Sequence, residues 1–471
     1  MTDVTGTLVD HTLSVTYADL SASVRDRLKQ HLLDTVGVSI GGRHVAASSP
    51  SVAAAVERLA GEGDEAVVAA TGERRTAADA ALANGTYAHS LDFDDTHRES
   101  SLHPGAPVVP AALAVAEREG ADAETFLAAV KAGYDVTCAV GRAAGPDAHY
   151  DRGFHITATC GTFGATAAAG VVAGLSREEL VDAFGVNGSQ AAGSLQFLEN
   201  GAWNKRLHPG LAARRAVEAV TLAAEGFRGA ADPLEGAHGF LSSYSDDPNP
   251  EAVADVGDRD AVMETALKPY PCCRYMHSAI DALTDLADEV DASAIERVVV
   301  DIPRSGVTLT GDPIERKRRP ENFVDCQFSM PFAAALSLTF GEAGLSAFVD
   351  AQDGLDDPDL RRLMDATEVV TTDAVAELFP EQWAARVVVE TTGGTHERFV
   401  ESASGEPEKP LGWDGVEAKF DELAAAADVP DAAADRLATT VRNLDDEGLD
   451  ALVDALTAAA GADARGVRAD D

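Results

Sequence analysis

The chain has 471 residues, 45% hydrophobic and 25% charged, which is the composition of a globular protein with room for two or more domains. Acidic residues outnumber basic ones by 79 to 37, so the formal net charge is −42. Such a surface repels nucleic acid and anionic membranes, and we expect neither as a partner.

The acidic residues are spread along the whole chain, and Asp is abundant beside Ala and Val. This pattern suits a cytosol of high salt, where ions screen the self-repulsion of the protein. An ordinary acidic enzyme is the alternative. The two interpretations differ in whether the protein stays folded when salt is removed.

Several common cofactor motifs are missing from the sequence. Five cysteines occur without a C-x-x-C pair, so neither a zinc ribbon nor an iron–sulfur site is predicted. G-x-x-x-x-G-K-[ST] and H-E-x-x-H are absent, and no G-x-G-x-x-G follows a strand pattern. The N-terminus "MTDVTGTLVDHTLSV" has no basic start and no long apolar run, so we predict a cytoplasmic protein without a signal peptide.

The first 230 residues are dominated by helix patterns. Residues 20–41 place Leu and Val at helical spacing, with serine near the start and glycine at the end. Segments 108–120 and 123–145 repeat the pattern and end in glycine, and 214–227 has the same character. A serine followed three residues later by glutamate predicts a capping box at the start of 176–198. Ala-rich helices joined by short turns predict a helical bundle.

One uncharged stretch, "ATCGTFGATAAAGVVAGL" at residues 158–175, is long enough to span a membrane. It consists largely of Ala, Gly and Thr, with little Leu, Ile or Phe to drive insertion. We therefore predict a buried central helix whose small residues let its neighbours approach closely.

The pattern changes after about residue 268. The β-branched run 295–303 predicts a strand, 385–404 predicts a hairpin across Gly393 and Gly394, and helical pieces lie between them. Residues 413–458 return to helix. The predicted fold is mainly α: an all-helical domain (1–268, completed by 405–471) and a smaller α+β lid domain (269–404).

The stretch "HSLDFDDTHRESSLHPG", residues 89–105, gathers histidines and carboxylates that repel one another or need partners if buried. It is therefore a candidate site, although a solvated loop has similar chemistry. A two-metal site of a hydrolase, formed by His89, Asp92, Asp94 and His97, is a further alternative by ligand type, because carboxylate and imidazole suit Mn or Fe.

Basic residues gather at three other places among small residues. "NKRLHPGLAARR" carries Lys205, Arg206 and His208 before a predicted Pro-Gly turn and helix. "LKPYPCCRYMHSAID" carries Lys268 and further cations, and "DRGFHITATCGTFG" places a histidine at the entrance of the Gly/Ala helix. In so acidic a protein, such clusters near helix N-termini predict local sites for anions, with plain surface capping as the alternative.

Taken together, these segments resemble the MmgE/PrpD family. The resemblance is carried by "LLDTVGVSIGG", "ANGTYAHSLDFDDTH…HPGAPVVPAALAVAE", "GFHITATCGTFGATAAAG", "NKRLHPGLAARRAVEAVTLAAEGF", "KPYPCCRYMHSAIDA" and "KPLGWDGVEAKF", in this order. It implies a helical domain with an α+β lid, a homodimer, and cofactor-free chemistry on small polycarboxylates. Members include 2-methylcitrate dehydratase, cis-aconitate decarboxylase and iminodisuccinate epimerase.

The resemblance also implies site residues. The pocket residues that it implies are Asp92, Thr96, His103, His155, Lys205 and Lys268. Decarboxylase-like members carry a histidine two residues after the proline of the K-x-x-P element, where this chain has Cys273, followed by Arg274 and His277. This departure disfavours decarboxylation and leaves dehydration or epimerisation favoured, with all three of these residues as candidates for substrate binding.

The shared difficulty of these reactions is negative charge on a carbon next to a carboxylate, which fixed cations stabilise. Lys205, Lys268 and Arg274 are the candidate cations, and His103 and His155 are the candidates for proton transfer because imidazole titrates near neutral pH. Asp92 would orient a histidine or act as the alternative base. Thr96 would hydrogen-bond the substrate.

We therefore expect a cofactor-independent and metal-free lyase for a small di- or tricarboxylate, most similar to 2-methylcitrate dehydratase, with these residues converging on the substrate. The alternatives are an epimerase or decarboxylase of a related acid, a metal-dependent hydrolase, and a non-catalytic helical scaffold.

Overall fold

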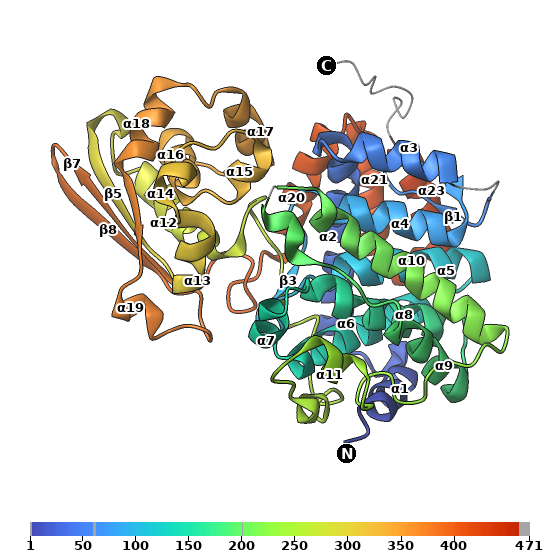
Figure 1. Cartoon of the computed structure of the whole chain (residues 1–471). Helices are drawn as coiled ribbons and strands as arrows, with labels where there is room; N and C mark the ends of the chain where they lie inside the picture. Colours follow the sequence, from blue (N-terminus) through green and yellow to red (C-terminus); the bar gives the residue numbers. More distant parts are fainter. Residues whose placement is uncertain (1, 60–62, 200, 461–471) are drawn as a thin grey trace. The chain divides into compact units, whose positions relative to one another are not determined.

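The computed structural model describes residues 2–59, 63–199 and 201–460. The chain divides into two units, one formed by Met1–Ala266 with Gly412–Asp471 (unit 1) and the other by Leu267–Leu411 (unit 2). Unit 1 is almost entirely helical, and unit 2 combines helices with a four-stranded sheet (Figure 1). The predicted fold class, mainly α with a smaller α+β part, is confirmed. The structure divides the chain at 266/267 and 411/412, and the domain boundaries expected from the sequence lie at 268/269 and 404/405. These expected boundaries remain a prediction.

Unit 1 is a bundle of helices with two very short sheets. Its helices are α1 (Val4–Ser14), α2 (Ala22–Val45), α3 (Ser49–Leu59), α4 (Ala77–Ala88), α5 (Gly105–Glu119), α6 (Ala123–Ala144), α7 (Pro146–Asp151), α8 (Ile156–Val172), α9 (Arg177–Gly188), α10 (Asn204–Ala224), α11 (Phe240–Tyr244), α20 (Gly412–Ala426), α21 (Asp431–Arg442), α22 (Leu444–Glu447) and α23 (Leu449–Ala459). Its paired strands are β1 (Ala66–Val67) with β2 (Arg74–Arg75), and β3 (Thr96–His97) with β4 (Thr265–Ala266).

The buried central helix predicted at 158–175 is α8, which begins at Ile156 and ends at Val172. It packs against α5, α6, α9 and α10, and nearly all of its residues are buried. A Cβ atom added at Gly164 would lie 1.7 Å from the Thr137 Oγ1 atom and 2.5 Å from the Gly133 carbonyl oxygen, both on α6. Small residues are therefore needed where α8 crosses α6, which explains the composition that the sequence shows.

Helix α10 differs from its prediction, because it begins at Asn204 and runs through Pro209 instead of following a Pro-Gly turn. The reason is tertiary packing against α4. A Cβ atom at Gly210 would lie 2.1 Å from the Thr86 Oγ1 atom, so the two helices touch at this point. This contact holds the chain helical where the proline removes a backbone donor. Lys205, Arg206 and His208 therefore lie in the first two turns of α10 and not ahead of it.

The starts of several helices follow local capping rules. The Ser21 side chain accepts from the Val24 N–H at the start of α2, and Ser176 and Glu179 form the predicted capping box of α9. Helix α9 ends at Gly188, so the pattern at 176–198 contains one helix followed by irregular chain and a short 3-10 turn. The box predicted the start of this helix correctly but not its end.

The chain returns to unit 1 after unit 2. Helix α20 packs along α2, and α21 packs on α2 and α23. Phe420 and Leu423 of α20 are buried. The last helices are thus part of the same core as the first ones, and α20 brings a lysine to the candidate site described below.

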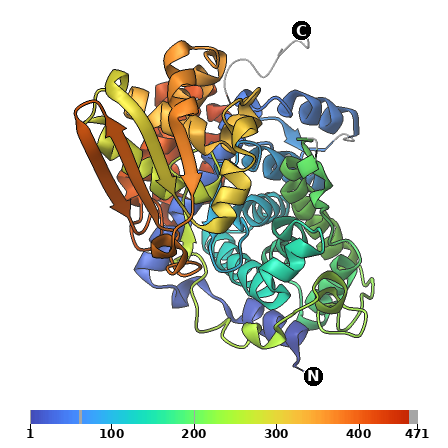
Figure 2. The ribbon, with the colours of Figure 1, turned by 60° about the vertical axis from the view of Figure 1, so that its left-hand side comes forward.

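Unit 2 is built on a four-stranded sheet. Its strands are β5 (Ile295–Asp301), β6 (Thr367–Val370), β7 (Ala385–Thr391) and β8 (Gly394–Val400), in the order β6-β5-β7-β8, with β5–β6 parallel and the other pairs antiparallel. Its helices are α12 (His277–Ala287), α13 (Arg304–Gly306), α14 (Ile314–Lys317), α15 (Phe323–Gln327), α16 (Met330–Phe340), α17 (Leu345–Asp353), α18 (Pro358–Ala366) and α19 (Asp373–Ala376). The strand and the hairpin predicted at 295–303 and 385–404 are confirmed, and Figure 2 shows the four strands side by side.

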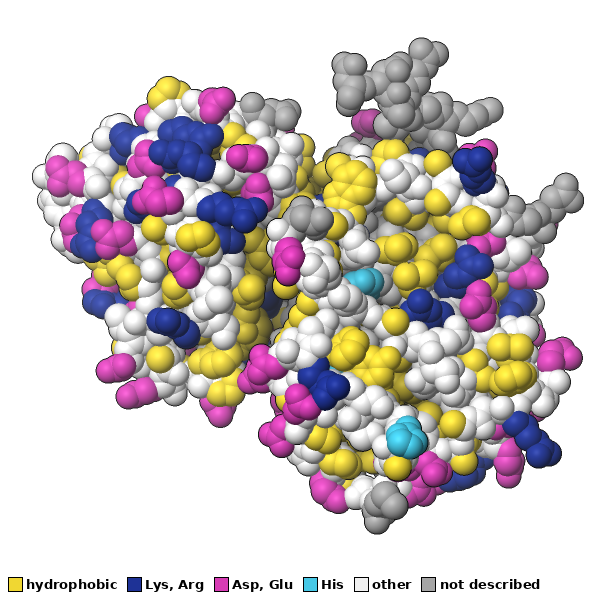
Figure 3. Space-filling view, viewed as in Figure 1, with side chains coloured by type: hydrophobic (Ala, Val, Ile, Leu, Met, Phe, Trp, Pro, Cys, Tyr) yellow, Lys and Arg dark blue, Asp and Glu magenta, His cyan; other side chains and the backbone are white. Residues whose placement is uncertain are grey.

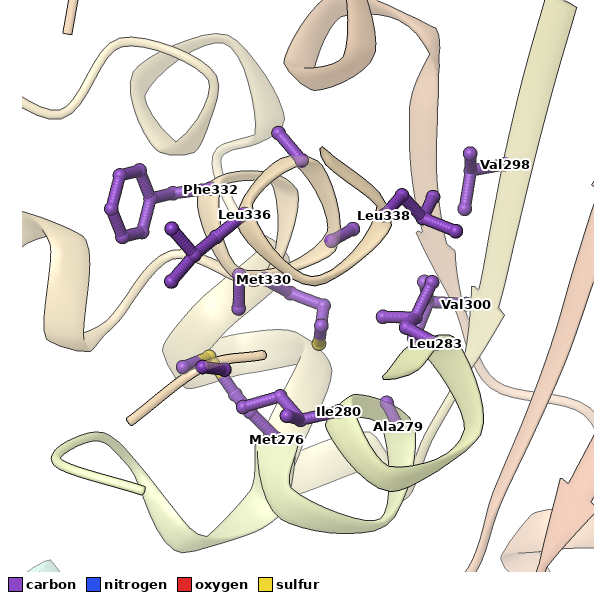
Figure 4. Close-up of a cluster of buried hydrophobic side chains, with 14 of the residues drawn as sticks. Met276, Ala279, Ile280, Leu283, Val298, Val300, Met330, Phe332, Leu336 and Leu338 are labelled. Atoms are coloured by element: carbon purple, nitrogen blue, oxygen red, sulfur yellow. The ribbon is translucent and has the colours of Figure 1, made fainter. Parts of the chain in front are cut away.

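The core of unit 2 lies between the sheet and its helices. Side chains of α12, α16 and β5 belong to one apolar cluster, and Figure 4 shows Leu283 and Leu338 on the side of Val298 and Val300. Strand β8 is mostly exposed or half-buried, which agrees with its place at the edge of the sheet. This core forms a scaffold for the segment 267–277, which carries four candidate residues.

Among the described residues, no single helix is long and apolar enough to cross a membrane. The bent pair formed by α16 and residues 345–352 of α17, with an angle of 106°, passes by length and composition alone.

The acidic surface leads to a prediction about salt. Asp and Glu side chains are scattered over the visible face of both units (Figure 3), and the net charge is −42. We expect the melting temperature to rise steeply with KCl and the fold to be lost in dilute buffer, because the Debye length falls to about 3 Å at 1 M salt and screens the repulsion. Thermal scans followed by circular dichroism between low and molar KCl, with sucrose as an uncharged control, measure this. A melting temperature that does not change with KCl would support an ordinary acidic enzyme.

Candidate active site

The segment between α4 and α5 is pinned at both ends. Helix α4 ends at its C-cap His89, and α5 begins at Gly105. Between them Thr96 pairs with Ala266, and His97 pairs with Thr265 and forms a second bridge to Leu102. The acidic segment is therefore buried and held in place, and it is not the solvated loop that the sequence left open as an alternative.

Asp95 ties this segment to the helices around it. Its Oδ1 accepts from the Gly105 N–H at 3.0 Å, and its Oδ2 accepts from the Tyr134 hydroxyl at 2.6 Å. The His31 Nδ1 atom lies 3.1 Å from the same Oδ2. Asp95 thus serves to hold the segment against α2, α5 and α6.

A lysine from the end of the chain supports the same segment. Lys419 of α20 is buried and donates to the Phe93 carbonyl oxygen at 2.6 Å, and its Nζ lies 2.5 Å from Asp34 Oδ1. Its ammonium also lies 3.9 Å from the centre of the Phe93 ring. Burial raises the pKa of Asp34 to about 6, although the charge of Lys419 opposes this shift. The position of Phe93, between two candidate aspartates, therefore depends on a buried ion pair.

Asp92 adopts a left-handed backbone conformation, with φ of 52°. Asp tolerates this region better than most residues because its short side chain bonds locally or to a neighbour. Here the partner is Lys205 in the first turn of α10, whose Nζ donates to Asp92 Oδ1 at 2.9 Å. Two residues predicted for the site from distant segments are thus in direct contact.

Asp94 lies between two imidazoles. Its Oδ2 is 2.7 Å from His89 Nδ1 and 3.4 Å from His103 Nδ1. His103 Nδ1 is also 3.4 Å from the Thr96 hydroxyl, and the His89 and His103 rings meet edge to face with centroids 4.8 Å apart. A carboxylate facing Nδ1 favours the tautomer that keeps its proton there, which leaves Nε2 of His103 as the basic atom.

A second pair of imidazoles adjoins the first. His155, the N-cap residue of α8, places its Nδ1 3.0 Å from Nδ1 of His208 in α10, and its ring lies 5.7 Å from that of His89. Burial, helped by the nearby positive charges of His89, His208, Lys205 and His103, holds the pKa of His155 well below its ordinary value. Burial together with the charges of His89, Arg215 and Lys205 lowers the pKa of His208 to about 4. These two rings are therefore neutral at neutral pH.

The cluster of His89, Asp94 and His103 has the ligand types of a metal site, and its candidate ligand atoms lie within 4.8 Å of one another. The separation of 2.7 Å between His89 Nδ1 and Asp94 Oδ2 is that of a hydrogen bond. Two ligands at about 2.0–2.1 Å from a tetrahedral zinc ion stand farther apart than this. The metal site considered at His89, Asp92, Asp94 and His97 is not assembled either, because Asp92 bonds Lys205 and His97 bonds Ser100 at 2.6 Å.

The other candidate residues belong to unit 2. Lys268 and His277 are buried, and both face the Cys272 carbonyl oxygen, at 3.3 Å from Lys268 Nζ and 3.2 Å from His277 Nε2. Arg274 is buried in an ion pair with Glu406. Cys273 belongs to the apolar core of this unit. The positions predicted from the sequence thus form two groups, one in each unit.

Two family models cover most of the chain. The MmgE/PrpD N-terminal domain matches residues 6–253, and the MmgE/PrpD C-terminal domain matches residues 270–446. The chain belongs to the MmgE/PrpD family. The resemblance noted from sequence motifs is therefore confirmed, and the first match contains the histidine and aspartate cluster of unit 1.

The curated relatives that match this MmgE/PrpD protein are named cis-aconitate decarboxylases or decarboxylase-like proteins. A cis-aconitate decarboxylase of Aspergillus terreus is 26% identical over 426 residues, which cover 84% of this chain and 82% of the relative. A cis-aconitate decarboxylase-like protein of Aspergillus oryzae is 25% identical, covering 90% and 91%. The human cis-aconitate decarboxylase is 26% identical, covering 72% and 71%.

Several residues of this candidate site have no distinguishing signal in the sequence. The sequence places His208 in a basic cluster but gives no sign that it contacts His155, and it indicates Asp94 only as a possible metal ligand. Nothing near Lys419 in the sequence "GVEAKFDEL" distinguishes it from a surface lysine of a helix. The sequence feature that marks His208 is its position directly before Pro209 and Gly210. At Gly210 helix α10 packs closely against α4.

Proposed function

We propose that this chain is a cofactor-independent lyase that acts on a small di- or tricarboxylate through an enediolate-type intermediate. The observation that carries the proposal is the cluster of the buried Asp92 and His155 with the partly exposed His103 and Lys205, within an MmgE/PrpD domain. The names of the curated relatives, two cis-aconitate decarboxylases and one cis-aconitate decarboxylase-like protein, agree with it.

The chemistry requires cations at the substrate carboxylate next to the reacting carbon, because negative charge develops there. Lys205 is the first candidate, since its ammonium is already at the cluster and a substrate carboxylate can replace Asp92 as its partner. Lys268 and Arg274 remain proposals for further carboxylates. His103 is the proposed base or acid, with Asp94 at its Nδ1 and Thr96 as a hydrogen-bonding neighbour.

Decarboxylation of a cis-aconitate-like acid is the candidate that the relatives favour. In this reaction the bond from carbon to the departing carboxylate breaks, carbon dioxide leaves, and the electron pair remains on carbon until a proton is delivered. The same cations stabilise this charge. The proton comes from Nε2 of His103, which would enter this reaction protonated at both ring nitrogens and leave it neutral.

Dehydration of a 2-methylcitrate-like acid is the second candidate, and a specific residue favours it. Cys273 stands where the resemblance implies a histidine in decarboxylase-like members. In this reaction neutral His103 removes the proton next to a carboxylate, and the C–O bond on the neighbouring carbon breaks as the alkene forms. The imidazolium then gives that proton to the departing hydroxyl, which leaves as water. Epimerisation needs the same proton removal, followed by its return from the opposite face.

The test is turnover of a panel of acids in molar KCl. Release of carbon dioxide from cis-aconitate supports decarboxylation, and a rise in alkene absorbance from 2-methylcitrate or citrate supports dehydration. The Lys205→Met variant, purified in the same way, controls for contaminating host enzymes. A folded protein that turns over none of these acids would contradict the proposal, as would activity that is lost on chelation and restored by a metal. We also propose a cytoplasmic homodimer, and light scattering of the same preparation measures its mass.

A further inference from the structure

His155 and His208 are joined by a hydrogen bond between their Nδ1 atoms. The two Nδ1 atoms are 3.0 Å apart, and both side chains are buried. His155 lies at the entrance of α8, and His208 lies in the second turn of α10. Phe197 packs edge-on against both rings, with centroids 6.2 Å from His155 and 5.9 Å from His208. The pair is thus fixed in a partly apolar setting.

The hydrogen bond between His155 and His208 limits where the protons on the two rings can lie. A hydrogen bond between two ring nitrogens requires one nitrogen with a proton and one with a lone pair. Burial lowers the pKa of both rings, so each ring carries a single proton at neutral pH. The two rings must therefore be opposite tautomers: one has its proton on Nδ1 and the other on Nε2. Whichever ring donates, its partner keeps an N–H at the far side.

We propose that His208 is the donor of this bond, so that it holds His155 as the tautomer with its proton on Nε2, ready to donate a hydrogen bond to an anionic substrate oxygen. The inference rests on the proposed function, because it takes the ligand to be a polycarboxylate. Carboxylate oxygens are acceptors only, so a lone pair at Nε2 would repel them while an N–H attracts them.

The neighbours of His155 agree with this assignment. A carboxylate at Nδ1 favours the Nδ1–H tautomer for His89 and His103, which leaves lone pairs at their Nε2 atoms. Of these two Nε2 atoms only that of the partly exposed His103 can face a substrate, because the His89 side chain is buried. A site with such an acceptor also needs donors for an anionic substrate, and Lys205 and the Nε2–H of His155 supply them. A neutral imidazole is a suitable donor to a developing enediolate, because it stabilises the negative charge without giving up its proton.

This assigns His155 a different role from the proton transfer expected from the sequence. His155 would be a catalytic residue that binds the enediolate oxygen, and His208 would be a positioning residue that acts through it. Proton transfer is then left to His103.

The first test reads the tautomer directly, without any turnover. In protein labelled with 15N at the histidine rings, a nitrogen that carries a proton and one that carries a lone pair resonate in separate ranges. The His155→Gln variant identifies the His155 signals by their loss. We expect Nε2 of His155 to be protonated and Nδ1 to be unprotonated. The reverse pattern would overturn the proposal.

The second test uses two variants of equal size. His208→Asn keeps a donor near the position of Nδ1, whereas His208→Asp offers only acceptors and forces the proton of His155 onto Nδ1. With the acid that the panel identifies, we expect kcat of the Asn variant to stay within about tenfold of the parent. The loss of one donor to the developing charge should lower kcat of the Asp variant about 10²–10³-fold, with KM changed much less.

Equal losses in both variants, with the same tautomer of His155, would show that His208 has only a packing role and would contradict the proposal. Circular dichroism and melting scans report whether each variant folds. If His208→Asp does not fold, the tautomer in the parent protein still decides the matter. If the parent turns over no acid but His155 carries its proton on Nε2, the proposed function fails while the tautomer assignment stands.

Discussion

Replacing His103 by Gln is expected to lower kcat about 10²–10⁴-fold, the usual contribution of general acid–base catalysis, while the protein keeps its fold. His103 combines a partly accessible ring, 12% exposed, with a buried carboxylate at Nδ1, in the arrangement of a base with an orienting group. Gln retains a polar side chain of similar length but does not take up a proton near neutral pH. Initial rates on the acid found in the panel, together with circular dichroism, measure the effect.

His11 provides a matched control for this prediction. Its side chain is 11% exposed, and its Nε2 lies 2.9 Å from the Asp135 Oδ2 atom, so it is another histidine paired with a buried aspartate. It lies on α1, outside the histidine cluster. The His11→Gln variant should lose some thermal stability and keep kcat within about threefold, well below the effect expected for an acid or base. Equal kcat values for both variants and the parent would remove His103 from the mechanism.

Replacing Lys419 by Met is expected to lower the free energy of unfolding by about 3–5 kcal/mol, because it leaves the buried Asp34 without its charged partner. Met preserves most of the volume, so the loss of charge dominates. The Phe93 carbonyl loses its donor at the same time, and Phe93 lies between Asp92 and Asp94. We therefore expect turnover to fall as well. Urea denaturation at constant KCl measures the stability.

Two further variants separate the causes. The double variant Asp34→Asn with Lys419→Met removes both charges and should recover most of the lost stability. The matched control is Lys29→Met, which breaks a pair with the more exposed Asp445 at 2.9 Å. A pair of that kind contributes at most about 1 kcal/mol. If Lys419→Met costs no more than Lys29→Met, the Asp34 pair does not stabilise the fold.

The decrease in the free energy of unfolding caused by Lys419→Met should also depend on pH. Burial raises the pKa of Asp34 to about 6 from its ordinary 3.8, so between these values the folded state binds more protons than the unfolded state. Stability therefore falls as pH rises through this window. Lys419 opposes the shift, and without it the pKa of Asp34 rises further and the decline extends to higher pH. The gap between parent and variant should be larger at about pH 8 than at about pH 5.

The sequence by itself determined the elements and the family. The helices α2, α6 and α8, the capping box of α9 and the hairpin of β7 and β8 were predictable, because each depends on residues a few positions apart, through the helical period, a cap or a turn. Motifs over nearly the whole chain resembled the MmgE/PrpD family, which the family models confirm. Candidates such as Asp92, His103 and His155 came from that resemblance.

Only the tertiary structure decided which of these side chains are partners. His155 meets His208 across 53 positions, Lys205 meets Asp92 across 113, and Lys419 reaches Phe93 across 326. Local sequence patterns do not predict such pairs, because the pairs form only when helices from separate parts of the chain pack into one core. The same packing carries α10 through Pro209, against the local preference of proline. The residue types of the candidate site can thus be predicted from the sequence. The hydrogen bonds and charge states of these side chains depend on burial and on residues that are distant in the sequence.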